Sequence, residues 1–232
     1  MVMLSVTPLI DEPALVIECD KKTLVIADTH VGIEYELLKR GINIPHQTEQ
    51  VKASIERIIG MTDAKRLVLL GDVKHNIPTV SILETKTVPR FLDFSIPVDI
   101  VKGNHDGSIE ALTSAPVHPY LTLDGIVLSH GHRNVPEMPF ETLILGHSHP
   151  AIEITDELGN RTKEKCWMRG TFPDGRGIII MPAFNPLITG IAFNGNQGRI
   201  PGSLFRSHSV EELSMTAYLL DGTYLGHVAD IT

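Results

Sequence analysis

Three features are scarce in this sequence: cysteine, positive charge and long apolar runs. The two cysteines, Cys19 and Cys166, are too few for a disulfide scaffold and suit a reducing cytoplasm. Lys and Arg total 20 against 28 Asp and Glu, and the net charge of −8 disfavours a protein that coats nucleic acid by neutralising its phosphates. No apolar run approaches the roughly 20 residues that span a bilayer. The first residues include acids where a secretion signal would be apolar, so we expect a cytoplasmic protein with no membrane partner.

Repeats, linkers and low-complexity segments are also missing. The hydrophobic fraction of 42% and the charged fraction of 21% are typical of globular proteins. We therefore expect one domain spanning residues 1–232. There is no Gly-rich loop ending in Lys-Ser or Lys-Thr, which argues against a nucleotide-binding switch or a kinase.

Short apolar runs rich in β-branched residues predict buried strands at 23–27, 66–70, 97–101, 125–128 and 142–145. Residues 32–40 and 46–60 have the apolar spacing of helices. This alternation in the first half predicts βαβ units and a mainly parallel sheet. From about residue 151, turn signals at 157–160, 194–198 and 221–222 predict antiparallel pairs or a mixed second sheet. We expect the two halves to pack face to face.

Residues that commonly bind metals follow each of the five predicted strands. Because ligands gather outside the carboxyl ends of strands in α/β sheets, we expect these clusters to converge. Carboxylate, amide oxygen and imidazole suit Mn²⁺, Fe²⁺, Zn²⁺ or Ni²⁺. The candidate ligands are Asp28, His30, Asp72, Asn104, His130, His147 and His149. They exceed the capacity of one tetrahedral ion, which predicts two ions sharing a carboxylate.

The ordered series resembles the motifs of the calcineurin-like metallophosphoesterase superfamily. The matching stretches, which span residues 28–149, are Asp28-x-His30, Gly71-Asp72, Gly103-Asn104-His105-Asp106, His130 and Gly146-His147-x-His149. A narrower resemblance, to the ICC-like phosphoesterases whose bacterial relatives are encoded beside ATP-dependent DNA ligases, rests on RGINIP, LGDVKH, LSHGH, LGHSHPAI, Cys166 and MPAF. The resemblance implies an α/β fold, a four-layer sandwich of two mixed β-sheets flanked by helices.

The resemblance also implies how the ligands divide between the two ions. One ion would be held by Asp28, His30 and His149, and the other by Asn104, His130 and His147, with Asp72 bridging both. His105 would lie beside the scissile phosphate, and Asp106 would orient it.

Other residues near these motifs are candidate substrate contacts. Many family members have an acidic or amide residue where this chain has His75, three positions after the bridging aspartate. We interpret His75 either as a substrate contact or as a hydrogen-bond partner of a ligand. His132 is either an exposed loop residue or a substrate contact, and Arg133 is a weaker candidate for binding phosphate. The Phe184-Asn185 pair is interpreted as core packing, with lining of the cleft as the alternative.

Together these residues predict a phosphoesterase with two divalent metal ions, Mn²⁺ first, with Fe, Zn or Ni as alternatives. A hydroxide bridging the ions would attack phosphorus in line with the leaving oxygen, while His105 stabilises or protonates the leaving group. We expect a phosphate-ester substrate, with phosphodiesters in nucleic-acid ends or nucleotides favoured. The sequence carries no indication of oligomeric state.

Other interpretations of the same residues are weaker. A metallo-β-lactamase-type site would need His-x-His-x-Asp-His, and GHSHPAIE lacks the later Asp-His. A catalytically inactive binding scaffold with this fold would ordinarily have lost ligands or the site histidine, and all of them are present. Taken singly, Asp28 fits a helix N-cap, and Asp72 and Asn104 fit turns. The ordered set favours metal binding.

Overall fold

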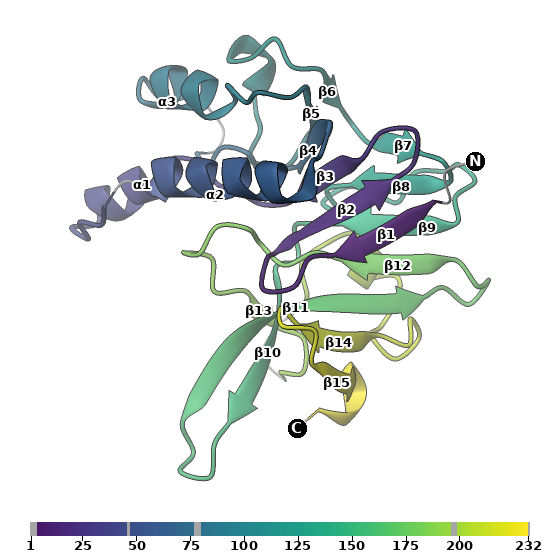
Figure 1. Ribbon diagram of the computed structural model, residues 1–232. Helices are drawn as coiled ribbons and strands as arrows, with labels where there is room; N and C mark the ends of the chain where they lie inside the picture. The colour runs from purple at the N-terminus through teal and green to yellow at the C-terminus, as the bar shows by residue number, and fades with distance from the viewer. Residues whose placement is uncertain (1–3, 46, 77–79, 196–198, 232) are drawn as a thin grey trace.

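The fold consists of two β-sheets that face each other, with helices on the outer side of the first (Figure 1). The computed structural model describes residues 4–45, 47–76, 80–195 and 199–231. The first sheet contains, in spatial order, β1 (Ser5–Pro8), β2 (Ala14–Glu18), β3 (Thr23–Ile26), β4 (Arg66–Leu70), β5 (Val98–Val101) and β6 (Val117–His118). The strands from β3 to β6 run parallel, whereas β1 and β2 pair in antiparallel fashion, so the sheet is mixed.

The second sheet is also mixed. Its order is β13 (Ile191–Ala192), β10 (Pro150–Thr155), β11 (Arg161–Thr171), β12 (Gly177–Ile180), β9 (Thr142–Leu145), β8 (Ile126–Ser129) and β7 (Leu121–Leu123). β14 (Thr216–Leu219) pairs with β11 and with β15 (Tyr224–His227). β8, β9 and β12 are parallel neighbours, so their carboxyl ends lie at one edge of the sheet.

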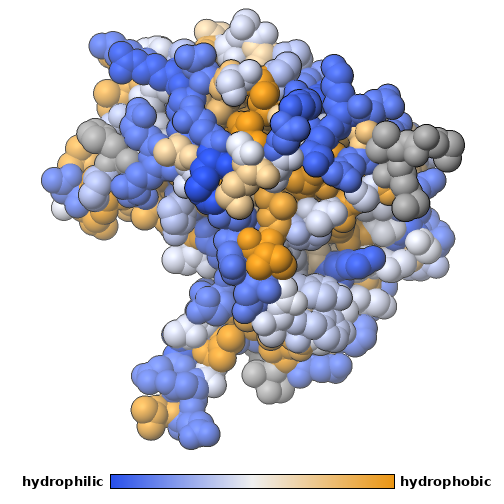
Figure 2. Space-filling view, in the orientation of Figure 1, coloured by the Kyte–Doolittle hydropathy of each residue, from blue (hydrophilic) through white to orange (hydrophobic). Residues whose placement is uncertain are grey.

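The β10–β11 hairpin forms an arm that projects from the body (Figure 1). Its surface is mainly hydrophilic (Figure 2), although Leu158 at its tip is 87% exposed. The arm begins at Pro150, directly after one of the candidate ligands.

Two helices, α2 (Gln47–Thr62) and α3 (Glu84–Phe91), pack on the outer face of the first sheet, and the shorter α1 (Ile33–Lys39) precedes α2 (Figure 1). The helix α2 buries Val51, Ile55, Ile58 and Ile59, which recur at intervals of one helical turn. Its apolar stripe packs in one cluster with sheet residues such as Leu67. Within the described residues, no helix has the length and apolar character needed to cross a membrane.

The sequence analysis missed the helix α3, and the reason is Pro89. Proline in a helix interior removes a backbone donor and normally ends the helix. Here the start of α3 is stabilised by a capping box, in which Glu84 N donates to Ser81 Oγ and the Glu84 carboxylate accepts from Ser81 N. The buried Val88 and Phe91 then attach the short helix to the core.

Alternation of side chains along the strands produces three apolar layers. In β3 and β4, Leu24 and Leu67 face the helices, while Val25 and Val68 face the second sheet. On the second sheet, Ile144 faces inward and Leu143 faces outward. The outward layer is covered by short 3-10 turns and loops, including Leu204 and Leu213, which form the fourth layer.

The expected fold class is therefore confirmed. Each of the five predicted strands begins and ends within one residue of its observed bounds. The hairpin expected around residues 221–222 is the β14–β15 pair. Residue 46 of the predicted second helix, and residues 196–198 of one predicted turn, lie outside the described residues.

Candidate metal centre

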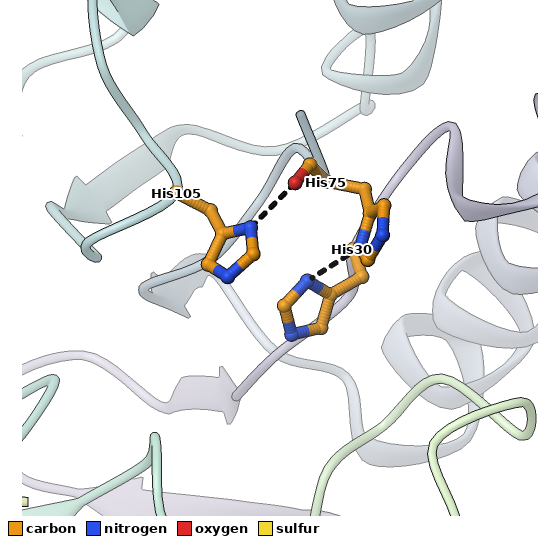
Figure 3. Close-up of side chains that lie close together, drawn as sticks. All are labelled: His30, His75 and His105. Carbon is orange, nitrogen blue, oxygen red and sulfur yellow. Dashed lines mark hydrogen bonds between the residues drawn. The ribbon is translucent and has the colours of Figure 1, made fainter. Parts of the chain in front are cut away.

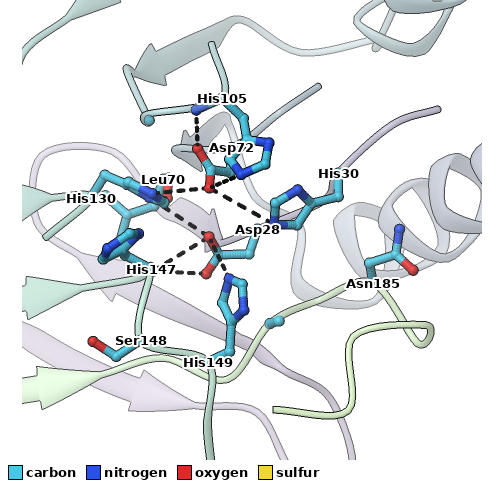
Figure 4. Close-up of polar contacts among 12 residues, drawn as sticks. Asp28, His30, Leu70, Asp72, His105, His130, His147, Ser148, His149 and Asn185 are labelled. Atoms are coloured by element: carbon cyan, nitrogen blue, oxygen red, sulfur yellow. Dashed lines mark hydrogen bonds and ion pairs between the residues drawn. The ribbon is translucent and has the colours of Figure 1, made fainter. Parts of the chain in front are cut away.

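The polar clusters meet where strands of both sheets end. Asp28 and His30 follow β3, Asp72 follows β4, and Asn104 follows β5 in the first sheet. From the second sheet, His130 follows β8, and His147 and His149 follow β9. Figure 4 shows carboxylates from the first sheet facing imidazoles from the second. The structure thus brings all seven candidate ligands into one region.

The backbone bends sharply at five of these residues. Asp28, His30, Asp72, His147 and His149 have φ angles of 58°, 43°, 47°, 66° and 42°. Side chains other than glycine rarely adopt this left-handed region, and each instance costs on the order of 1–3 kcal/mol. In an extended segment, side chains two residues apart, such as those of His147 and His149, point to the same side. The bend, in which Ser148 N donates to Gly146 O at 2.7 Å, instead places His147 with Asp72 and His130, and His149 with Asp28 and His30.

Two glycines allow the loops to approach closely enough. A Cβ atom at Gly71 would lie 2.1 Å from His130 Nδ1, and one at Gly103 would lie 2.1 Å from Asp72 Oδ1. Any larger residue would displace a candidate ligand. The glycines that precede Asp72 and Asn104 are therefore part of how the ligands come together.

Three groups of side chains among the described residues lie close enough to share a cation: His30, His75 and His105 form one, and the candidate ligands form the other two. Asp28, His30 and His149 each offer one atom, and these atoms lie within 4.8 Å of one another; Asp72, His130 and His147 form a second such group. Asp72 stands between the groups, because its Oδ2 is 3.3 Å from His130 Nε2 and 3.8 Å from His30 Nε2. Asn104 Oδ1 lies 3.3 Å from His130 Nε2, beside the second group.

Unpaired buried atoms show that these residues fit a cation. Among the described residues, His30 Nε2 and His149 Nε2 are buried without a hydrogen-bond partner, an arrangement that typically costs about 1–3 kcal/mol per group. A divalent ion would bind both nitrogens. The donor set contains oxygen and nitrogen and no sulfur, which suits hard or borderline metals.

Charge in the metal-free site centres on His130. Burial would raise the pKa values of Asp28 and Asp72, but neighbouring imidazoles, His149 and His130 respectively, lower both below the ordinary value. Burial would lower the pKa of His130, but its contact with Asp72 raises it to about 9. At neutral pH, His130 therefore holds a proton between two carboxylates, in the place where a cation would otherwise compensate them.

Other ligand histidines are already neutral. Burial lowers the pKa of His30 to about 3 and that of His147 to about 4. Neutral imidazole is the form that binds metals. These two side chains need lose no proton to bind an ion at neutral pH.

His75 lies beside His30 and His105 (Figure 3). Its Nδ1 is 3.3 Å from His30 Nδ1, and its carbonyl oxygen accepts a hydrogen bond from His105 Nδ1. His105 Nε2 is left facing Asp72, 3.9 Å from Oδ2. Burial also lowers the pKa of His75. One residue therefore fixes the rings of a candidate ligand and of the candidate catalytic histidine.

The hydrogen bonds of the Asp106 carboxylate go to backbone groups. Its Oδ1 accepts from the backbone N–H groups of Val73 and Lys74, and its Oδ2 accepts from Gly103 N at 2.8 Å. Burial raises the pKa of this fully enclosed carboxyl to about 6. Asp106 ties together the loops after β4 and β5, and the carbonyl of His75 holds the ring of His105.

His132 and Arg133 lie at the margin of the second group. Their side chains contact each other, since Arg133 Nε donates to His132 Nε2 at 3.1 Å. The His132 ring is half-buried, 6.1 Å from that of His147, while Arg133 is exposed. Burial lowers the pKa of His132 to about 4.

Two residues near the site were missed by the sequence analysis. Phe184 packs in the core as expected, but the Nδ2 group of its neighbour Asn185 donates to Thr29 O at 2.8 Å, inside the loop that carries two candidate ligands. Lys165 on β11 donates to the carbonyl of Asn185. The available signal was a polar residue between Phe184 and Pro186 in an otherwise apolar stretch.

Comparison with known proteins agrees with this geometry. The sequence model of the family described as Calcineurin-like phosphoesterase matches residues 21–229. Among solved structures, nuclease MPE from Pseudomonas putida is similar at 17% identity and a TM-score of 0.56, covering 94% of this chain and 98% of that one. Yfce, a phosphoesterase from E. coli, is similar at 19% identity and a TM-score of 0.44, with coverage of 90% and 99%. At 17% identity, the similarity to nuclease MPE shows a shared fold.

No curated protein matches the sequence. The family match nevertheless extends over nearly the whole chain, and the ligand groups lie within it. The protein therefore belongs to the calcineurin-like phosphoesterase family and is a metal-dependent phosphoesterase.

Proposed function

We propose that this phosphoesterase hydrolyses phosphodiesters with two divalent metal ions. Asp28, His30 and His149 would hold one ion, and Asn104, His130 and His147 would hold the other, with Asp72 shared. The observation that carries the proposal is the pair of adjacent ligand groups, one around Asp28 and one around Asp72. A single ion would leave one of the groups without a cation.

When bound, such a pair of ions neutralises phosphoryl oxygens and makes water available as a nucleophile near neutral pH. The chain itself supplies the second half of the chemistry through His105. Its Nε2 faces the space beside Asp72, and its side chain is 21% exposed, so a bound phosphate ester can reach it. From there His105 would stabilise or protonate the leaving oxygen.

His75 prepares both neighbouring rings for these tasks. If His30 binds an ion through Nε2, its Nδ1 carries the hydrogen and donates to His75 Nδ1, 3.3 Å away. The carbonyl of His75 accepts from His105 Nδ1, so the hydrogen that a protonated ring can donate to the leaving oxygen is the one on Nε2. We therefore assign His75 as a hydrogen-bond partner of a ligand, in preference to a substrate contact.

Manganese is the ion we propose first. The donors are carboxylate, amide oxygen and imidazole, which suit Mn²⁺, with Fe²⁺, Zn²⁺ and Ni²⁺ as alternatives. Affinity alone would favour the later metals of the series, so the native ion depends also on which metals the cell supplies.

For the substrate, we propose phosphodiesters at nucleic-acid ends or in nucleotides. Similarity in fold to a protein titled a nuclease supports this class. The net charge of −8 favours short ends or small diesters over a long duplex. At the margin of the site, the exposed Arg133, which also donates to His132, supplies donors for a neighbouring phosphate. Membership in the ICC-like subgroup stays a prediction.

The proposal can be tested with bis-p-nitrophenyl phosphate on the purified chain, stripped of metal by a chelator and then titrated with Mn²⁺. We expect turnover to appear with Mn²⁺, to saturate near two ions per chain, and to exceed that on the p-nitrophenyl monoester. Single-stranded, double-stranded and cyclic nucleotide substrates then define the class.

The alternative of an inactive scaffold makes the opposite prediction. A chain that binds Mn²⁺ but hydrolyses none of these esters would be a binding protein. Saturation at one ion per chain would contradict the two-ion assignment.

A further inference from the structure

Residues 183–185, which follow β12, lie against the loop that carries Asp28. Asn185 N donates to Asp28 O at 3.4 Å, and Asn185 Nδ2 donates to Thr29 O at 2.8 Å. Asn185 is only 1% exposed, so water does not compete for these bonds. The segment therefore holds two consecutive carbonyl groups of the loop.

Lys165 holds this segment in turn from β11 of the second sheet. Its Nζ donates to Ala183 O at 2.8 Å and to Asn185 O at 2.7 Å. Burial lowers the pKa of the ammonium to about 8, an effect that the nearby carboxylate of Asp28 opposes. At neutral pH Lys165 is therefore charged, and both of these bonds go to backbone carbonyls.

Lys165 is partly buried, and an ammonium group in this position carries a desolvation cost. Burying a charge without a carboxylate partner is unfavourable, and an apolar side chain would avoid that cost. In return, hydrogen bonds from a charged donor are roughly twice as strong as neutral ones, and an ammonium can serve two acceptors at once. Lys165 fits a requirement to keep residues 183–185 fixed.

The loop that these residues hold is strained. Asp28 and His30 have φ angles of 58° and 43°, and such conformations persist only when their surroundings fix them. On the side of the first sheet, Thr29 Oγ1 donates to Val73 O at 3.1 Å and His30 N donates to Asp72 O at 2.8 Å. From the side of the second sheet, Phe184 N donates to Ala27 O at 2.9 Å and His147 N donates to Asp28 Oδ2 at 3.0 Å. Asn185, which Lys165 holds, adds the two contacts to the carbonyl groups of Asp28 and Thr29.

We propose that Lys165 and Asn185 are positioning residues of the metal centre, an inference that rests on the proposed function. Lys165 fixes the segment, and Asn185 fixes the loop so that Asp28 and His30 face His149 before an ion arrives. Neither residue binds the ion. By holding the loop in its binding conformation, they lower the free-energy cost of reorganising the loop when it binds a cation.

The test is Mn²⁺ binding to the full metal-free chain, measured by isothermal titration calorimetry. Lys165→Met keeps an unbranched chain of similar length but removes the donors, and we expect the dissociation constant for Mn²⁺ to rise about 10–100-fold. Lys165→Arg retains charge and donors and should recover part of the loss. Lys163→Met, an exposed lysine two residues away on the same strand, is the matched control and should bind like the parent.

Asn185→Ala provides a second, independent variant if Lys165→Met does not fold, and it should also weaken Mn²⁺ binding. Thermal unfolding of each metal-free variant separates the two kinds of role. A purely structural role would lower the unfolding temperature and leave Mn²⁺ affinity within twofold of the parent, and that result would overturn the proposal. An equal loss of affinity in Lys163→Met would overturn it as well.

Asp28→Ala distinguishes this inference from the proposed function. If Asp28→Ala loses Mn²⁺ affinity while Lys165→Met and Asn185→Ala keep it, the positioning role is wrong and the metal centre stands. If Asp28→Ala binds Mn²⁺ like the parent, the proposed centre is wrong, and the positioning role fails with it.

Discussion

Histidine and aspartate come together in two places on the first sheet, and the two places differ in how their polar atoms are paired. Near the amino ends of β4 and β5, Asp99 accepts from Arg66 Nε and contacts His118 Nε2, each at 2.8 Å. At the carboxyl ends of the strands, His30 Nε2 and His149 Nε2 are buried and unpaired among the described residues. Polar atoms of the same residue types therefore have hydrogen-bond partners at the amino ends of the strands, whereas two of them have none at the carboxyl ends within the part of the chain that the structure describes.

The backbone differs in the same way. Asp99 lies within β5 in regular strand geometry, whereas Asp28 and Asp72 adopt left-handed φ angles of 58° and 47°. Strain and unpaired atoms both cost stability, so a chain keeps them only where another requirement applies. The comparison teaches that unpaired nitrogen and bent backbone, more than the presence of Asp and His, mark the functional cluster.

The largest difference is expected between two variants in which one aspartate, Asp72 or Asp99, is replaced by alanine. Asp72→Ala should reduce Mn²⁺-dependent turnover by roughly 10³-fold or more, because it removes a carboxylate next to both ligand groups. Asp99→Ala should leave turnover unchanged and lower the free energy of unfolding by about 1–3 kcal/mol, since it strands Arg66 and His118.

Steady-state kinetics and denaturant unfolding of both variants decide this. A loss of turnover in Asp99→Ala comparable to that in Asp72→Ala would break the comparison.

A somewhat smaller effect is expected for His105→Ala. His105 contributes no atom to the two groups assigned to the ions, so Mn²⁺ binding should persist while turnover falls by about 10²–10⁴-fold. Metal analysis of the purified variant, combined with kinetics, checks both halves. His118→Ala, at the paired cluster, is the matched control and should turn over like the parent. Near-normal activity of His105→Ala would remove it from the mechanism.

The smallest effect concerns pH. In the metal-free chain the pKa of His130 is raised to about 9 by its contact with Asp72, although burial alone would lower it. Below that pH an ion must displace the proton, so Mn²⁺ affinity should rise with pH, by up to tenfold per unit, and level off above about 9.

Calorimetry at pH 7 in two buffers of different ionisation enthalpy should show about one proton released per chain. Affinity that does not change between pH 6 and 8 would contradict the assignment. At the Asp99 cluster, pH is expected to change the stability of the fold. Burial would raise the pKa of Asp99, but Arg66 and His118 lower it below its ordinary value. The stabilising contribution of Asp99 is therefore lost as pH falls through that lowered pKa.

Local patterns made much of this predictable from the sequence. Apolar runs ending at polar or glycine residues predicted the strands within one residue, and the topology of parallel strands then predicted that their ends meet. The helix α3 was missed because Pro89 contradicts helix propensity and tertiary packing overrides it. The prediction of a single domain stays a prediction.

Contacts between a side chain and distant backbone groups could not be predicted, because they leave no recognisable pattern in the sequence. Asp106 binds N–H groups 32 and 33 residues away, and Lys165 binds carbonyls, so neither partner is specified by side-chain type. The role of His75 was likewise open, because its contact with His30 depends on how two loops 45 residues apart are placed. Such contacts require coordinates.

Each ligand group draws on both sheets: Asp28 and His30 face His149 across the seam, and Asp72 faces His130 and His147. Cations bound there would connect the two sheets, which also pack through apolar side chains such as Val68 and Ile144. Chelation would thus do more than stop turnover. It would remove one of the connections between the two sheets, at the catalytic edge, while the apolar layer and the hydrogen bonds from residues 184 and 185 remain.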